Sequence, residues 1–88
     1  MLLEDRKNIR NIMTEQELQT ALFLLNFQKE EKGSNNWKWY LVLLSNNIRY
    51  SIGCWEGGNT YYSLYINGTT KYESISTKDF LDKVLEVL

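Results

Sequence analysis

The sequence contains no histidine and only one cysteine, Cys54. Histidine is the commonest general base and the commonest metal ligand of proteins, so its absence excludes most catalytic and metal-binding sites. A structural zinc site needs a set of cysteine and histidine ligands that a lone cysteine cannot provide, and a lone cysteine cannot form an internal disulfide. These absences predict a protein that is not an enzyme and carries no metal and no cofactor.

Proline and long apolar runs are also missing. No stretch approaches the ~20 apolar residues that a membrane-spanning helix requires, and residues 1–6 are too charged for a signal peptide. We therefore expect a cytoplasmic protein without membrane contact. The lack of proline, together with abundant asparagine, lysine and isoleucine, indicates an A/T-rich coding genome, such as that of a phage or a low-GC bacterium.

Neither sign of charge is in excess, since 10 Lys and Arg residues stand against 11 Asp and Glu residues. Sequence-independent nucleic-acid binding draws its affinity from a surplus of basic groups, so this balance disfavours it. Aromatic residues, in contrast, are plentiful, at 14% of the 88 residues. A chain of this length supports one hydrophobic core, and we expect a single domain over residues 13–88, preceded by an arm or short helix over residues 1–12.

The first helix start is marked by Thr14 and Glu17, which have the spacing of a capping box. In this motif each side chain bonds the backbone N–H of the other residue. Apolar residues then recur at helical spacing. They are Leu18, Ala21, Leu22 and Leu25. Gly33 is a residue typical of helix ends, so the pattern predicts a helix over about residues 15–31.

The second helix start has the same form. Ser76 and Asp79 have capping-box spacing, and Ile75 and Phe80 occupy the positions of a hydrophobic staple around it. One apolar and one charged face come after this start, which predicts an amphipathic helix that runs to the C-terminus.

Between the helices, apolar and aromatic residues have the pattern of strands separated by turns. Asn46-Asn47 and Asn67-Gly68 are two-residue hairpin signals, because both residue types tolerate positive φ. The predicted strands cover about residues 37–44, 48–55, 61–66 and 69–74. The fold class is therefore α+β: an N-terminal helix, a four-stranded antiparallel β-meander and a C-terminal helix.

The hairpin turns fix which side chains share a face of the sheet. Leu43 then lies opposite Tyr50, and Leu41 opposite Ile52. The face expected under the helices carries Trp37, Trp39, Leu41, Leu43, Tyr50, Ile52 and Cys54, joined by Tyr62, Leu64 and Ile66 if the Gly57-Gly58 connection has five residues. A connection of four residues would exchange the two faces of the strand over residues 61–66. The opposite face is expected to carry Lys38, Tyr40, Val42, Leu44, Arg49, Ser51, Trp55, Tyr61, Ser63, Tyr65 and Tyr72. If both helices cover the first face, the second stays open.

This second face is the candidate partner-binding surface. Tyrosine and tryptophan are enriched in binding hot spots. The candidate residues are Tyr40, Trp55, Tyr61, Tyr65, Tyr72, Lys38 and Arg49. The competing structural explanation is that the tyrosines line a half-wet sheet or that a helix covers each face.

Two functions fit such a face. The first is a small, non-catalytic protein-interaction module, such as a phage-encoded inhibitor of a host defence protein, with homodimerisation through the open face as part of the hypothesis. The alternative is a single-stranded DNA- or RNA-binding protein, in which tyrosines stack on bases beside Lys38 and Arg49. The partner's identity does not follow from the residues.

Cys54 and the glycines have simpler explanations than chemistry. Cys54 alternates in phase with Ile52 and has no histidine to activate it, so we expect a buried small hydrophobe instead of a reactive thiol. Gly53, Gly57 and Gly58 match no phosphate-binding spacing and are interpreted as part of a hairpin turn.

Overall fold

The structure is a computed structural model that describes residues 13–31 and 37–88. The predicted arm or helix over residues 1–12 lies outside these residues. Within them the chain forms helix α2 (Glu15–Leu24), strand β1 (Gln28–Lys29), strands β2 (Trp37–Ser45), β3 (Ile48–Trp55), β4 (Tyr61–Ile66) and β5 (Thr69–Ser74), and helix α3 (Thr77–Val87).

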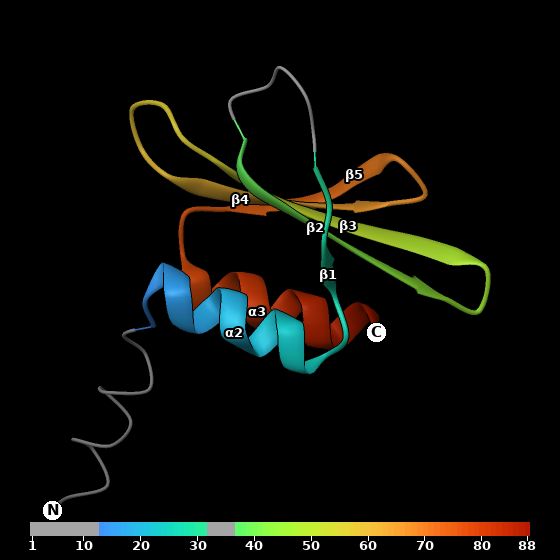
Figure 1. Ribbon diagram of the computed structural model, residues 1–88. Coiled ribbons are helices and arrows are strands. Elements are labelled where there is room, and N and C mark those ends of the chain that lie inside the picture. Colours follow the sequence, from blue (N-terminus) through green and yellow to red (C-terminus); the bar gives the residue numbers. More distant parts are fainter. Residues whose placement is uncertain (1–12, 32–36) are drawn as a thin grey trace, which may run out of the picture.

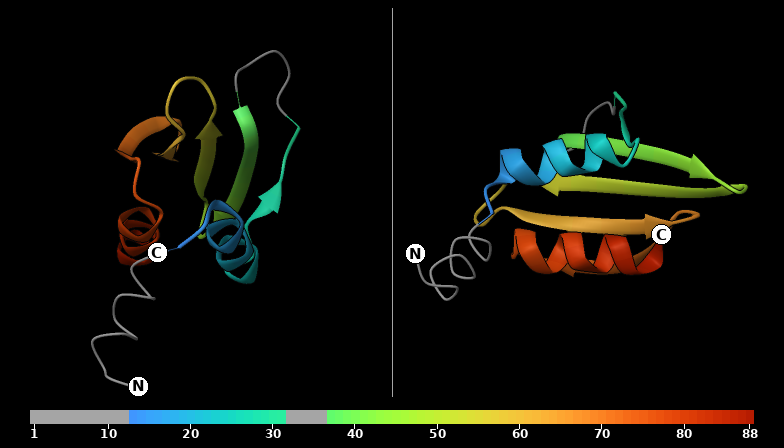
Figure 2. Two further views of the ribbon diagram at one scale, coloured as in Figure 1. Left: turned by 90° about the vertical axis from the view of Figure 1, so that its left-hand side faces the viewer. Right: turned by 90° about the horizontal axis from the view of Figure 1, so that it is seen from below.

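The strands form one antiparallel sheet in the order β1-β2-β3-β4-β5, and both helices lie side by side against the same face of it (Figure 1). Seen from the helical side, α2 and α3 lie in front of the sheet and run roughly along its strands, and no helix of the described residues lies on the other face (Figure 2). The α+β class and the order of elements are as predicted. The strand count is not, because the sheet has five strands and not four.

Helix α2 begins as predicted. The Thr14 hydroxyl accepts from the Glu17 backbone N–H at 3.0 Å, and a Glu17 carboxylate oxygen accepts from the Thr14 N–H at 2.9 Å. The hydrogen bond from Thr14 lowers the pKa of Glu17, since it stabilises the ionised carboxylate. Leu18 and Leu22 are fully buried and hold the helix on the sheet.

The predicted end of this helix, near residue 31, is wrong. Asn26 takes the left-handed conformation with φ 79°, and the Phe27 N–H closes back onto the Leu22 carbonyl at 3.1 Å. This is the hydrogen-bond pattern of a helix C-cap, with asparagine in place of glycine. Phe27 is then buried, and Glu30 donates its N–H to the Tyr40 carbonyl at 2.9 Å. The chain is thereby drawn into the sheet, which creates the unpredicted strand β1.

Helix α3 starts at the predicted residue, but its cap differs in detail. Ser76 accepts from the Asp79 N–H at 3.1 Å, while the Ser76 N–H donates to the Ser74 hydroxyl instead of to Asp79. The proposed staple also fails, because Ile75 is 74% exposed. Phe80 and Val84, both fully buried, carry the packing of this helix.

The central hairpins have the predicted register. Leu43 pairs with Tyr50, Leu41 with Ile52, and Trp55 with Tyr61. Both predicted two-residue turns form with positive φ at each residue: Asn46 and Asn47 at 54° and 65°, and Asn67 and Gly68 at 52° and 84°. The core accordingly lies between the helices and one face of the sheet. Its sheet residues are Trp39, Leu41, Tyr50, Ile52, Cys54, Tyr62 and Leu64.

No helix in the described ranges is long and apolar enough to cross a membrane.

Candidate functional site

The open face is the face of the sheet that points away from α2 and α3. Because side chains alternate along a strand, it carries the residues between the core positions of β2, β3 and β4, together with Trp37 and Glu73. They are Trp37, Tyr40, Val42, Leu44, Arg49, Ser51, Gly53, Trp55, Tyr61, Ser63, Tyr65 and Glu73. Tyr40, Val42, Ser51 and Ser63 are buried on it even though neither α2 nor α3 covers them. The open face is therefore a packed surface that buries its own polar and aromatic groups.

Trp37 organises this surface, and its predicted place under the helices is wrong. The register of β2 against β3 shifts between Trp37 and Trp39, so that Trp37 pairs with Trp55 and Trp39 with Cys54. Lys38 is the extra residue of this β-bulge, and a bulge moves the side chains beyond it to the other face. The Trp37 ring lies 3.7 Å from the Trp55 ring and 5.3 Å from the Tyr40 ring, measured between centroids.

Gly53 provides the place where this indole lies. It lies inside β3, paired with Tyr40 and Ser63, as the predicted strand over residues 48–55 requires, and not in the hairpin turn with which it was grouped beside Gly57 and Gly58. A Cβ at this position would approach the Trp37 ring to 1.8 Å. The absence of a side chain at Gly53 is thus what allows the Trp37 ring to lie flat on the sheet, an arrangement in which an aromatic ring covers an exposed strand glycine.

A second group of open-face residues is held by hydrogen bonds. The Trp55 indole N–H donates to the Ser63 hydroxyl at 3.1 Å, and that hydroxyl donates to Glu73 Oε2 at 3.0 Å. The Trp55 and Tyr61 rings stack at 6.0 Å with 21° between their planes. Trp55 and Tyr61 are therefore positioned by specific contacts, as expected of anchor residues and not of mobile surface side chains.

Tyr72 does not belong to this surface, contrary to prediction. A register shift between Leu64 and Tyr65 places Tyr72 opposite Leu64, on the helix side. There it lies 6.3 Å from the Phe80 ring, with the Lys83 ammonium 5.4 Å from its centroid.

The same shift brings Glu73 opposite Ser63, so the face carries an acidic residue that was not among those expected on it.

The two predicted basic groups are both engaged in ion pairs. Lys38, the bulge residue, turns to the helix side and contacts Glu15 of α2 at 3.0 Å, and this hydrogen bond raises the pKa of its ammonium. Glu15 also accepts from the Trp39 indole at 3.1 Å. Arg49 remains on the open face, where its guanidinium contacts Glu30 at 3.1 Å. The open face therefore carries no unpaired cation from the predicted set.

A hollow of about 460 Å³ lies at the centre of the open face. Ser51 forms its floor and is only 2% exposed. Three of its lining residues are aromatic, and Arg49 and Asn67 contribute polar groups. It is lined by Trp37, Tyr40, Arg49, Ser51, Tyr65, Asn67 and Gly68. The small side chain of Ser51 leaves this space between the larger side chains of Tyr40 and Tyr65, which lie on the two neighbouring strands.

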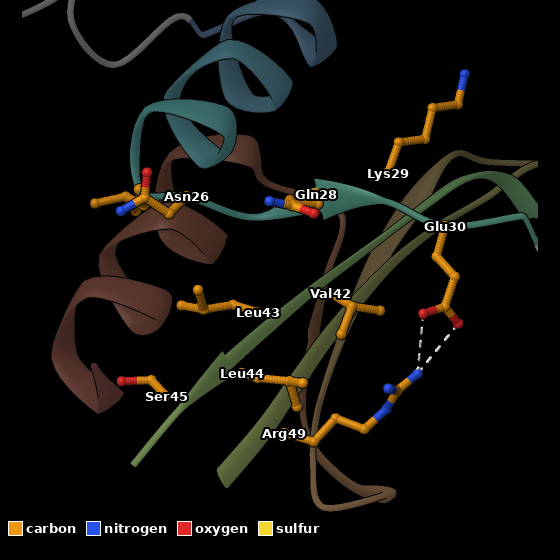
Figure 3. A pocket seen from close by; sticks show the side chains of 10 residues that line it. Asn26, Gln28, Lys29, Glu30, Val42, Leu43, Leu44, Ser45 and Arg49 are labelled. Atoms are coloured by element: carbon orange, nitrogen blue, oxygen red, sulfur yellow. Dashed lines mark hydrogen bonds and ion pairs between the residues drawn. The ribbon is translucent and has the colours of Figure 1, made fainter. Parts of the chain in front are cut away.

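A larger hollow of about 690 Å³ lies at the edge of the sheet, below the end of α2 (Figure 3). It is present because β1 pairs with only two residues of β2, Leu41 and Val42. β1 therefore does not pair with the last part of β2, which pairs with β3 on its other side. Leu44 lies beside it, 70% exposed. In Figure 3 the Arg49–Glu30 ion pair stands at its rim, and Arg49 lines both hollows.

Two groups that could take part in chemistry, the Cys54 thiol and the Tyr62 hydroxyl, belong to buried residues. Cys54 is fully buried as predicted, and burial raises the pKa of its thiol to about 12. Burial also raises the pKa of the Tyr62 hydroxyl to about 12. Among the described residues, no three Cys, Asp or Glu side chains come close enough together to hold a metal ion.

The sheet edges are poorly suited to pairing with another strand. β5 is interrupted by a bulge beside Lys71 and Glu73, and β1 has only two residues. Bulges, charged side chains and short edge strands are the usual devices that prevent edge pairing. The aromatic open face, in contrast, has no such protection.

No family model matches this chain, and neither a curated protein nor a solved structure matches it.

Proposed function

We propose that the protein is a small, non-catalytic interaction module that binds a protein partner through the open face. The observation that carries the proposal is the Trp37–Gly53 arrangement: a glycine inside a strand is unfavourable, yet here it permits a cluster of aromatic rings on the face without helices. Rigid aromatic side chains held in fixed positions are the typical hot-spot residues of protein interfaces.

The size of the open face fits this role. Strands spaced by ~4.8 Å with a rise of ~3.3 Å per residue give a face of roughly 20 by 25 Å, on the order of 500 Å² in projection. The accessible area of a corrugated surface exceeds its projection, so the face approaches the ~800 Å² that each partner buries in a standard interface.

Charge favours protein over nucleic acid as the partner. Stacking platforms for single strands combine aromatic rings with a positively charged groove. Here Lys38 points to the helix side, Arg49 is paired with Glu30, and Glu73 adds a negative charge. The nucleic-acid alternative therefore lacks the cations on which it depended.

The finer form of the proposal is an inhibitor, encoded by a phage, that occupies a host protein and can also pair with a second copy of itself. Its support is compositional: a short chain, an A/T-rich residue usage and the lack of histidine. The cytoplasm is the compartment in which such a protein would act.

The test uses the tagged protein as bait in a bacterial lysate, with and without nuclease, beside the Tyr61→Ala/Tyr65→Ala double variant. We expect partner capture that resists nuclease and is lost in the double variant, whose far-UV circular dichroism matches the parent. Sedimentation velocity of both proteins reports self-association through the same face. Capture that disappears with nuclease supports the nucleic-acid alternative and contradicts the proposal.

A further inference from the structure

The central hollow of the open face combines aromatic walls with an excess of hydrogen-bond donors. Three tryptophans occur in the chain, and the indole N–H groups of Trp39 and Trp55 are bound by Glu15 and Ser63. The Trp37 indole N–H, in contrast, takes part in none of the side-chain hydrogen bonds among the described residues. Trp37 also forms a wall of the hollow.

The polar end of the hollow adds further donors. The side-chain oxygen of Asn67 accepts a hydrogen bond from the backbone N–H of Arg49 at 3.0 Å. The side-chain NH₂ group of Asn67 is therefore available. One nitrogen of the Arg49 guanidinium contacts Glu30, and the guanidinium has further N–H groups. On the floor, Ser51, which is only 2% exposed, adds a hydroxyl that can donate or accept a hydrogen bond.

From this geometry we propose that the hollow binds a proline-rich segment of a protein partner in the polyproline II conformation. A segment of this kind offers backbone carbonyl acceptors, but its proline residues have no N–H. It therefore matches a site that presents many donors, whereas an ordinary extended peptide would bring N–H groups that need acceptors. Proline-rich segments are recognised in aromatic-lined grooves, because their preformed conformation costs little entropy to bind.

Size and charge agree with this ligand. A volume of about 460 Å³ falls within the usual range for ligand sites, and the hollow is a shallow groove open to solvent. Arg49, the one cationic side chain that lines the hollow, already forms an ion pair with Glu30. A bound segment therefore needs no acidic group to balance the charge of Arg49. The inference rests on the proposed function and specifies the chemistry of the partner.

The test titrates the protein with decaproline, the simplest polyproline II peptide, and with a Gly-Ser decapeptide as control. We expect saturable changes in tryptophan fluorescence and in the amide NMR signals of Ser51, Tyr65 and Asn67 with decaproline alone. Tyr65→Ala should weaken decaproline binding at least tenfold. Tyr61→Ala is the matched control, because it removes the same side chain from the same strand and face but does not line the hollow.

Several outcomes would overturn the inference: no saturable change with decaproline at millimolar concentration, equal loss in both tyrosine variants, or equal binding of the Gly-Ser peptide. Binding of oligo-dT in the hollow without binding of decaproline would assign it to nucleobases and overturn the inference too. If decaproline fails while lysate capture still depends on Tyr61 and Tyr65, only this inference is lost. If capture is also independent of both tyrosines, the proposed function is lost with it.

Discussion

Replacing Gly53 with alanine tests the construction of the open face. The backbone at Gly53 is that of an ordinary strand, so alanine by itself should stabilise the protein by about 0.5–1 kcal/mol through the lost flexibility of glycine. The new Cβ, however, would lie 1.8 Å from one atom of the Trp37 ring and 2.3 and 2.4 Å from two others. Trp37 must move, and overpacking of this kind costs about 1–3 kcal/mol.

The double-mutant cycle with Trp37→Ala separates these two effects. In the Trp37→Ala background the obstacle is gone, so Gly53→Ala should change sign and stabilise by about 0.5–1 kcal/mol. The coupling energy is the difference between the two backgrounds. The glycine contribution cancels in this difference, which leaves the overpacking cost of about 1–3 kcal/mol. Urea denaturation followed by far-UV circular dichroism measures it without relying on the altered tryptophan signal.

Gly58→Ala serves as the control for this cycle. Gly58 has φ +67° and no atom near the position of an added Cβ, so alanine there is strained by the backbone conformation alone. The cost, about 1–2 kcal/mol, should be the same with and without Trp37. If Gly53→Ala is equally destabilising in both backgrounds, Trp37 does not lie on Gly53, and the reasoning about the open face is refuted.

Three further predictions concern the rest of the fold. Thr14→Ala and Ser76→Ala should each lower the free energy of unfolding by about 0.5–2 kcal/mol, the usual cost of an N-cap; urea curves that overlay the parent would contradict both caps. Asn26 has the left-handed backbone conformation. Asn26→Gly should therefore leave the free energy of unfolding unchanged or raise it, while Asn26→Ala should lower it by about 1–2 kcal/mol. Burial raises the pKa of the Cys54 thiol to about 12. This thiol should therefore stay unreactive towards a disulfide reagent at pH 8 and react once urea unfolds the protein. Its folded pKa lies above the unfolded value, so the associated stability is complete below pH ~8.5 and is lost as the pH rises towards 12.

The sequence was informative where a short motif determines local geometry. The two-residue turns at Asn46-Asn47 and Asn67-Gly68 fixed the pairing of β2 with β3 and the position of the turn between β4 and β5. The side-chain faces of β2 and β3 followed from that pairing, because alternation along a strand has a period of two residues. The capping box at Thr14 likewise fixed the start of α2.

The errors arise from single-residue irregularities that no motif announces. One extra residue at Lys38 moves Trp37 to the open face, and one between the partners of Leu64 and Tyr65 moves Tyr72 to the helix side. Each bulge reverses the face on which the side chains beyond it lie. The end of α2 was missed because asparagine forms a left-handed cap less often than glycine, so Gly33 looked the better stop than Asn26.

The candidate site was accordingly predicted in part. The open face itself and five of its predicted contributors, Tyr40, Arg49, Trp55, Tyr61 and Tyr65, are where the alternation placed them. The roles of Gly53, Ser63 and Glu73 were not predicted. A glycine flanked by core positions within a strand pattern was the available signal for Gly53, since such a glycine often marks the close approach of another group.

The central claim is that the open face, and not the helical layer, binds the partner. The most direct measurement compares partner capture by two folded double variants at equal bait concentration: Tyr61→Ala/Tyr65→Ala on the open face, and Leu24→Ala/Leu85→Ala on the exposed helical surface, where these leucines are 80% and 52% exposed. We predict that the tyrosine variant loses capture and that the leucine variant retains the level of the parent. Retained capture by the tyrosine variant, with loss in the leucine variant, would contradict the claim.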